Sequence, residues 1–125
     1  MINFKNKKIL VTGATGGIGK TLVQKFVSLE GNVLATGTKT EKLDALKKEF
    51  PNINILKFDI SDHSKIEEFI ENVASQLVGL DILVNNAGIN MDNLSLRMKD
   101  DEWKKVIDLN LGSTFFLCKY GIKKM

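Results

Sequence analysis

Short apolar runs alternate with segments of helical periodicity along the 125 residues of the chain. This alternation is typical of βαβ units, in which crossover helices join parallel strands. The predicted strands are residues 8–12, 32–36, 53–58 and 80–84, each followed by a segment of helical spacing. The pattern therefore predicts an α/β fold with four parallel strands and alternating helices, ending inside or just after a helix.

Apolar spacing within the helices predicts the faces that pack on the sheet. The first helix is expected to bury Ile18, Leu22, Phe26 and Leu29. The second is expected to begin with a capping box of Thr38 and Glu41. The stripe expected of the third helix is Ile66, Phe69, Ile70, Val73 and Leu77. That of the last helix is Trp103, Val106, Ile107, Asn110, Leu111, Phe115, Cys118 and Ile122, loosened near Gly112.

Composition indicates one globular domain over residues 1–125 and excludes several other classes. Hydrophobic residues make up 43% and charged residues 26% of the chain, which is ordinary for a folded soluble protein. A single cysteine excludes a disulfide framework and a cysteine-based zinc site. The net charge of +3 is spread over lysines that neighbour acids, so no nucleic-acid surface is expected. The apolar run 9–11 is too short for a leader or a membrane span, which favours a cytoplasmic protein.

Four glycines fall within residues 12–19, where the first strand passes into the first helix. A turn of this kind lets a ligand approach the backbone, and the helix N-terminus offers unpaired N–H groups. The ligand that suits it is an anion, usually a phosphate. The segment from Ala14 to Gly19-Lys20-Thr21 differs from a Walker A loop at one residue, because Ala14 replaces the first glycine. In that interpretation Asp59 would be the acid on the magnesium side. The glycines also fit a dinucleotide turn, and on their own they leave both interpretations open.

Three further features accompany the glycine turn. Asn85-Asn86-Ala87-Gly88 ends the fourth strand, Asp59 follows the third, and Asn110 lies in the last helix. Together with Thr12-Gly-x-x-x-Gly-Ile-Gly19 they resemble the short-chain dehydrogenase/reductase family over essentially the whole chain. Within that family, residues 86–103 are similar to the NADPH-dependent 3-oxoacyl-[acyl-carrier-protein] reductases of fatty-acid synthesis. The resemblance implies a Rossmann-type doubly wound parallel sheet whose order begins 3-2-1-4 and which is truncated after the helix that follows strand four. It also implies an acyl-carrier-protein thioester as substrate and a homo-tetramer.

The resemblance also implies a role for individual residues. The pyrophosphate would lie on Gly13, Thr15, Gly16, Gly17, Ile18 and Gly19. The adenine would contact Asp59 and Ile60, and the ribose–nicotinamide side would contact Asn86, Ala87 and Gly88. Asn110 would be the member of the catalytic set, organising a water and a lysine. Two alternatives stay open from the residues themselves: Asn85 and Asn86 as plain turn formers, and Asn110 as a structural bridge to nearby backbone.

The end of the second predicted strand favours NADP(H) over NAD. An NAD site needs an acid at this position to accept the ribose hydroxyls. This chain has Thr38 and Lys39 there, with no acid before Glu41. Thr38 could hydrogen-bond a 2′-phosphate and Lys39 could neutralise it. Many NADP-using relatives carry a basic residue at the place of Gly16, and this chain does not.

The groups that the family uses for proton donation are not found at their expected places. The family motif is a Ser and a Tyr-x-x-x-Lys beyond a fifth strand, and the chain is expected to reach Met125 before that strand. Tyr120 and Lys124 reproduce the spacing by chance, on the helix that carries Asn110. The 125 residues alone are therefore expected to be inactive, with strand four as an exposed edge. We expect His63 at the surface, and Cys118 as a buried thiol.

Overall fold

The computed structural model describes residues 2–125 and contains a four-stranded parallel sheet. The strands are β1 (Lys8–Val11), β2 (Asn32–Gly37), β3 (Asn54–Lys57) and β4 (Ile82–Val84). The α-helices are α1 (Gly17–Ser28), α2 (Thr40–Glu49), α3 (Ile66–Leu77), α4 (Asp100–Val106) and α5 (Thr114–Ile122). A 3-10 helix, η1 (His63–Lys65), precedes α3, and a π-helix, η2 (Ile107–Ser113), joins α4 to α5. The strand order is β3-β2-β1-β4, which confirms the predicted fold class.

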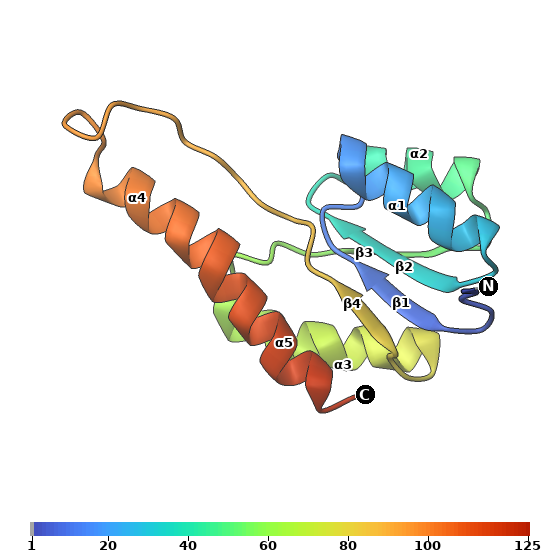
Figure 1. Ribbon diagram of the computed structural model, residues 1–125. Coiled ribbons are helices and arrows are strands. Elements are labelled where there is room, and N and C mark those ends of the chain that lie inside the picture. The colour runs from blue at the N-terminus through green and yellow to red at the C-terminus, as the bar shows by residue number, and fades with distance from the viewer. Residues whose placement is uncertain (1) are drawn as a thin grey trace.

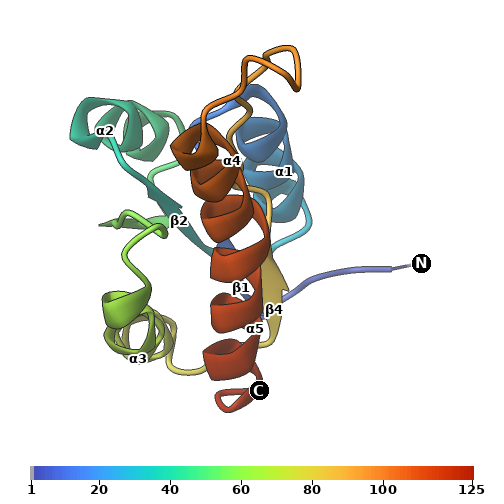
Figure 2. The same ribbon diagram turned by 90° about the vertical axis from the view of Figure 1, so that its left-hand side faces the viewer.

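Helices cover both faces of the sheet, α1 and α2 on one side and α3 and α5 on the other (Figures 1 and 2). Successive side chains of β1 therefore enter different layers of the core. Ile9 and Val11 pack with the α1–α2 layer, and Leu10 packs with the α3–α5 layer. Because both faces of the sheet are buried, each strand is a nearly continuous run of apolar residues.

Strand register brings the loops that follow the strands to one edge of the sheet. Val11 pairs with Ala35 of β2 and with Val84 of β4, so β1 and β4 end together and β2 ends just beyond. The turn before α1, the end of β2 and the segment after β4 consequently meet at the carboxyl edge. Ligands of open α/β sheets bind at this edge.

The predicted stripe of α3 is correct, whereas that of α1 is wrong at Ile18 and only half-buried at Leu22, Phe26 and Leu29. All five expected α3 residues are buried. In α1 the buried residues are Gly19 and Val23, whereas Ile18 is 73% exposed. Ile18 lies in the first turn of α1, beyond the carboxyl edge of the sheet, so no strand lies beneath it. The Thr38 capping box is also absent, because α2 begins at Thr40 with Lys39 as its N-cap and no side-chain cap bond.

The apolar stripe predicted for the last helix faces outward instead of inward. Trp103, Ile107, Leu111, Phe115 and Ile122 are all exposed. The buried residues on this side are Ser113, Leu117 and Gly121. The loosening expected near Gly112 is the π-helix η2. A π turn holds one extra residue, which rotates the residues after it by about 100° relative to an uninterrupted α-helix.

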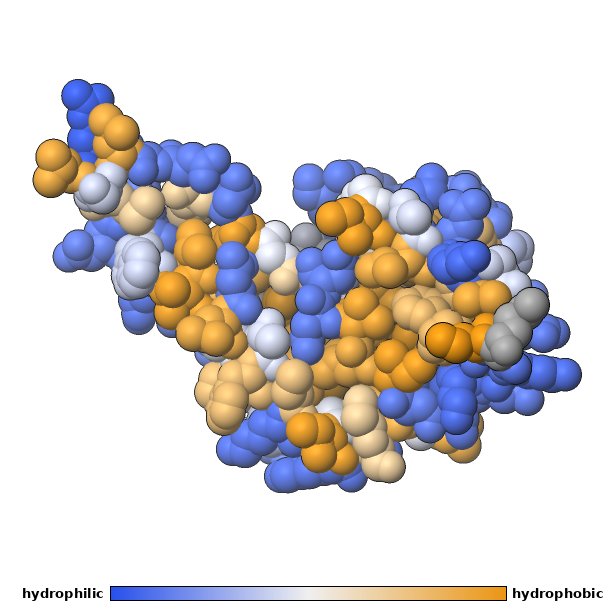
Figure 3. All heavy atoms as spheres, viewed as in Figure 1, coloured by the Kyte–Doolittle hydropathy of each residue, from blue (hydrophilic) through white to orange (hydrophobic). Residues whose placement is uncertain are grey.

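Two surface features of this side follow from the arrangement. α4 extends beyond the sheet and buries none of its residues (Figure 1). Apolar side chains gather over the long helix and near β4 (Figure 3), where the three residues of β4 are half-buried at the sheet edge. Among residues 2–125 no helix combines the length and apolar character needed to cross a membrane.

Candidate functional site

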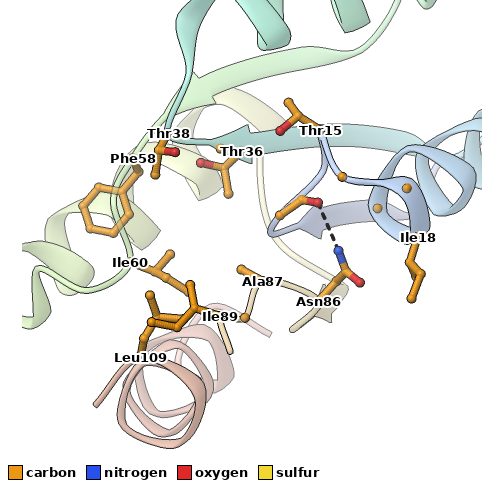
Figure 4. Close-up of a pocket in the computed structure, with 16 residues that line it drawn as sticks. Thr15, Ile18, Thr36, Thr38, Phe58, Ile60, Asn86, Ala87, Ile89 and Leu109 are labelled. Carbon is orange, nitrogen blue, oxygen red and sulfur yellow. Dashed lines mark hydrogen bonds between the residues drawn. The ribbon is translucent and has the colours of Figure 1, made fainter. Parts of the chain in front are cut away.

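A pocket of about 550 Å³ opens at the carboxyl edge of the sheet (Figure 4). One wall is the glycine turn before α1, and the opposite wall is the segment after β4. The end of β2 and the residues after β3 close a third side, and Leu109 of η2 reaches in from the long helix. Loops from all four strands therefore build a single cavity.

The glycine turn fits closely against its neighbours. Gly13 has a φ of +59°, and a Cβ there would lie 2.8 Å from Ala87 Cα. A Cβ on Gly19 would overlap the carbonyl oxygen of Gly13 and lie 2.8 Å from Ala14 Cα. Gly16 is the N-cap of α1, with no side-chain cap bond and no acidic residue in the first turn. The first N–H groups of α1 are thus left without side-chain caps beside the pocket, as an anion site requires.

Thr12 and Asn86 join the glycine turn to the segment after β4. The Thr12 hydroxyl donates to the Val84 carbonyl at 3.2 Å and accepts from the backbone N–H groups of Asn86 at 3.1 Å and Ala87 at 3.0 Å. The Asn86 side-chain amide donates to the Gly13 carbonyl at 3.0 Å (Figure 4) and to the Thr12 carbonyl at 3.1 Å. The pocket floor is therefore held by hydrogen bonds between two loops distant in sequence.

The side of the pocket formed by β2 and β3 is more apolar. The Thr36 hydroxyl is directed to the Leu56 carbonyl at 2.6 Å, away from the cavity. Phe58 lines the pocket and stacks on Phe69, with ring centroids 4.2 Å apart. Ile60 lies beyond it in the same wall. This surface suits a flat, weakly polar ring system.

All but three of the predicted site residues line the pocket. The exceptions are Lys39, Asp59 and Asn110. The Asp59 carboxylate accepts from the Ser61 N–H at 3.0 Å and the Ser61 hydroxyl at 2.7 Å, so it is engaged within its own turn. Lys39 is the N-cap of α2 and lies just beyond Thr38.

Asn110 forms the backbone bridge that the sequence left open as an alternative. Its side-chain oxygen accepts from the Ile89 N–H at 2.9 Å, and its amide donates to the Ile89 carbonyl at 2.7 Å. The residue itself is exposed, contrary to its expected place on a buried stripe. The bridge ties the long helix to the pocket wall at Gly88 and Ile89.

Sequence reasoning missed Thr36, Gly37, Phe58, Ile89 and Leu109, all of which line the pocket. The first four directly adjoin predicted site residues or strand ends, so extending each motif by one or two residues would have included them. Leu109 had no such signal. It enters the pocket because the π-helix turns it inward.

The structure does not favour the Walker interpretation. Lys20 pairs with Glu49 of α2 at 2.9 Å and lines a separate cavity of about 270 Å³ between α1 and α2. The Thr21 hydroxyl donates back to the Gly17 carbonyl at 3.0 Å. Neither side chain therefore reaches the glycine pocket.

Other candidate groups also lie outside the pocket. Lys124 pairs with Glu71 of α3 at 2.8 Å, and Tyr120 packs against the α3 layer of the core. Cys118 is half-buried, not buried as expected, and its sulfur accepts from Asn85 at 3.3 Å. Within residues 2–125 no three His, Cys, Asp or Glu side chains gather into a metal-binding group.

A parallel sheet in the order β3-β2-β1-β4, with helices on both faces and a glycine turn at its carboxyl edge, defines a Rossmann-type α/β protein. Within this class the chain belongs to the short-chain dehydrogenase family, whose model matches residues 7–125.

Curated relatives and solved structures agree with this assignment. The 3-oxoacyl-[acyl-carrier-protein] reductase FabG of Salmonella typhimurium is 38% identical over 125 residues, covering 99% of this chain and 51% of that protein. FabG of Rickettsia conorii is 41% identical over 126 residues, covering all of this chain and 51% of that protein. A short-chain dehydrogenase/reductase from Brucella melitensis superposes with a TM-score of 0.91 at 30% identity, covering 98% of this chain and 54% of that one. The chain thus spans about half the length of the curated relatives it matches.

Proposed function

We propose that the protein is an NADPH-dependent oxidoreductase that reduces a 3-oxoacyl thioester on acyl carrier protein to the 3-hydroxyacyl form, in fatty-acid synthesis. Residues 1–125 would be its NADP(H)-binding Rossmann half-domain. The observation that carries the proposal is the continuous pocket in which Gly13, Gly19 and Asn86 meet with no room for larger side chains. Close backbone approach of this kind fits a dinucleotide, which would supply the hydride.

The pocket walls suggest how the cofactor would lie. The pyrophosphate would rest on the turn from Gly13 to Gly19 and the N–H groups of α1. The 2′-phosphate would contact Thr38 and Lys39, and the adenine would lie along Phe58 and Ile60, near Asp59. The nicotinamide side would then reach Asn86, Ala87 and Gly88, with Asn110 behind the wall.

The pocket lacks a group that could protonate the product. None of the side chains that line it is a Tyr, Lys, Ser or any acid. Hydride transfer to a ketone needs a proton donor for the developing alkoxide.

We therefore expect the purified 125-residue chain to show no reduction of a 3-oxoacyl thioester by NADPH above the uncatalysed rate. The assay is the loss of NADPH absorbance, with FabG of Rickettsia conorii as the positive control. Substrate-dependent turnover by the 125-residue chain would contradict the prediction and would require a proton donor within it.

Calorimetry with NADPH, NADH and ATP–Mg tests the cofactor. NADPH should bind at least about tenfold more tightly than NADH, because a charge-assisted bond to the 2′-phosphate contributes about 1.4 kcal/mol or more. The variant Thr38→Asp should lose this preference or reverse it, since its carboxylate would repel the 2′-phosphate.

The matched control is Gln24→Glu, which adds the same charge on the exposed middle of α1 and should keep the wild-type preference. Equal affinity for NADPH and NADH in the wild type would exclude the NADP assignment. Preference for ATP–Mg would restore the Walker interpretation.

A second candidate is a nucleotide-binding or oligomerising module without catalysis, favoured by the absence of an acid–base group among the pocket-lining residues. It differs from the first in its response to substrate. NADPH binding by a longer form of the protein that still turns over no thioester would support it.

We also propose that the protein is a homo-oligomer, a tetramer by family resemblance. The support is the outward-facing stripe of the long helix, with Leu111 65% and Phe115 61% exposed. Apolar surface gathered on one helix face is typical of association sites.

A further inference from the structure

The π-helix η2 needs an explanation, because π segments are rare and are often found at functional sites. It covers seven residues and has Asn110 at its centre. Widening the turn changes the alignment of its carbonyl groups, so side chains are needed to satisfy them. One of these is Thr114, whose hydroxyl donates to the Asn110 carbonyl at 2.8 Å.

His63 supplies a second such partner. This residue lies in η1, directly after the β3 wall of the pocket, and it is half-buried instead of surface-exposed as expected. Its Nε2 lies 2.9 Å from the Asp108 carbonyl and 3.0 Å from the Ser113 hydroxyl. These two residues are close to the two ends of η2, so one imidazole nitrogen spans the π segment.

The hydrogen on this nitrogen can be assigned from its partners. The carbonyl of Asp108 can only accept. The Ser113 hydroxyl is fully buried and directs its own hydrogen to the Ile60 carbonyl at 2.6 Å, which leaves its oxygen as an acceptor for His63. Nε2 must therefore carry a hydrogen and donate to both neighbours.

The imidazole ring also fits its surroundings closely. A Cβ on Gly112 would lie 3.0 Å from His63 Cε1, so a larger residue would require the ring to shift by a few tenths of an ångström. The Phe116 ring lies on another side, with centroids 5.0 Å apart. Gly112 and Phe116 thus hold the ring where Nε2 meets η2.

We propose that His63 is a positioning residue for Asn110. By holding Asp108 and Ser113, its Nε2–H stabilises η2 in the π conformation, and this places the Asn110 amide on the Ile89 backbone. Ile89 and Leu109 line the pocket, so His63 acts on the cofactor site from outside it. The part assigned to Asn110 in catalysis rests on the proposed function, whereas the hydrogen-bond chain His63–η2–Asn110–Ile89 does not.

The test is amide hydrogen exchange and NMR on the 125-residue chain without nucleotide. In His63→Ala, exchange of the Ile89 N–H should be about five- to tenfold faster, the factor expected for one lost hydrogen bond. Exchange of the Ile70 N–H in α3 should be unchanged, because Ile70 reports the core. His63→Gln, whose side-chain amide can replace Nε2–H, should restore wild-type exchange at Ile89. His63→Asn is the matched control, because its amide is too short to reach and it should behave as alanine.

Two further measurements keep the result decisive if His63→Ala unfolds. Gly112→Ala keeps the imidazole but requires it to shift by a few tenths of an ångström, which lengthens the Nε2 bonds, so exchange of the Ile89 N–H should also be faster. Ring ¹⁵N spectra of the wild type should show His63 protonated at Nε2. Unchanged Ile89 exchange in a folded His63→Ala, no recovery in His63→Gln, or an unprotonated Nε2 would each overturn the proposal. Because no readout uses a cofactor, failure of NADPH binding would count against the proposed function alone.

Discussion

Replacing Gly19 with alanine should unfold most of the chain and abolish nucleotide binding. The new methyl group would overlap the Gly13 carbonyl oxygen and lie 2.8 Å from both Ala14 Cα and the Asn86 amide nitrogen. Two of these neighbours are backbone atoms, so the clash cannot be relieved by rotating a side chain. We expect a loss of at least about 4 kcal/mol, which is comparable to the whole stability of a marginal domain.

Gly17→Ala is the matched control for this prediction. A Cβ at Gly17 meets nothing within 4 Å, and the residue begins α1. Since alanine is the better helix former, this variant should be neutral or up to about 1 kcal/mol more stable. Urea denaturation monitored by far-ultraviolet circular dichroism measures both variants, and NADPH calorimetry is then applied to those that fold. Similar stabilities for the two variants would show that the turn can rearrange.

Thr12→Val should cost about 1–3 kcal/mol although it changes the shape of the side chain very little. The Thr12 hydroxyl accepts from two backbone N–H groups, those of Asn86 and Ala87, and Thr12 itself is only 1% exposed. Valine would leave the Ala87 N–H without a partner, whereas the Asn86 N–H would keep its bond to the Val84 carbonyl at 3.0 Å. A buried unsatisfied group costs about 1–3 kcal/mol. The segment after β4 should then be held to the glycine turn less firmly at Ala87, while the two bonds of the Asn86 amide remain.

Thr12→Ser separates the hydroxyl from the methyl group. It keeps all three hydrogen bonds and removes one methyl, so it should cost only about 1 kcal/mol. The same urea titrations measure the difference, and exchange of the Asn86 and Ala87 N–H groups shows where it arises. Equal losses for valine and serine would mean that packing, not hydrogen bonding, holds this part of the pocket floor.

Much of the fold could be predicted because the local signals agree with the tertiary packing. In α3 every apolar residue of the stripe faces the sheet, so periodicity alone identified its buried face. The apolar run of each strand ends at the carboxyl edge of the sheet. The ends of these runs therefore indicated which loops build the pocket. The glycine turn and Asn86-Ala87-Gly88 were found for the same reason, since close backbone approach restricts residue type at those positions.

The predictions failed where packing partners lie far away in the sequence. The stripe of the last helix has correct helical spacing, but α4 extends beyond the sheet and η2 rotates the residues after it, so the stripe faces outward. Asn110 was identified, yet its partner Ile89 could not be known from spacing. His63 was expected at the surface because its own segment is polar, while its contacts come from η2 and Phe116.

The sequence by itself determined the class of fold and the glycine turn, because these depend on local periodicity and on positions that only glycine can fill, and the strand order followed from the class. Tertiary structure alone decided which face of the long helix is buried, where Leu109 enters the pocket and what holds Asn110. The physical reason is that a π turn and the hydrogen bonds that stabilise it join segments about fifty residues apart, as the 2.6 Å bond from Ser113 to the Ile60 carbonyl shows. Such bonds leave no periodic signal in the chain.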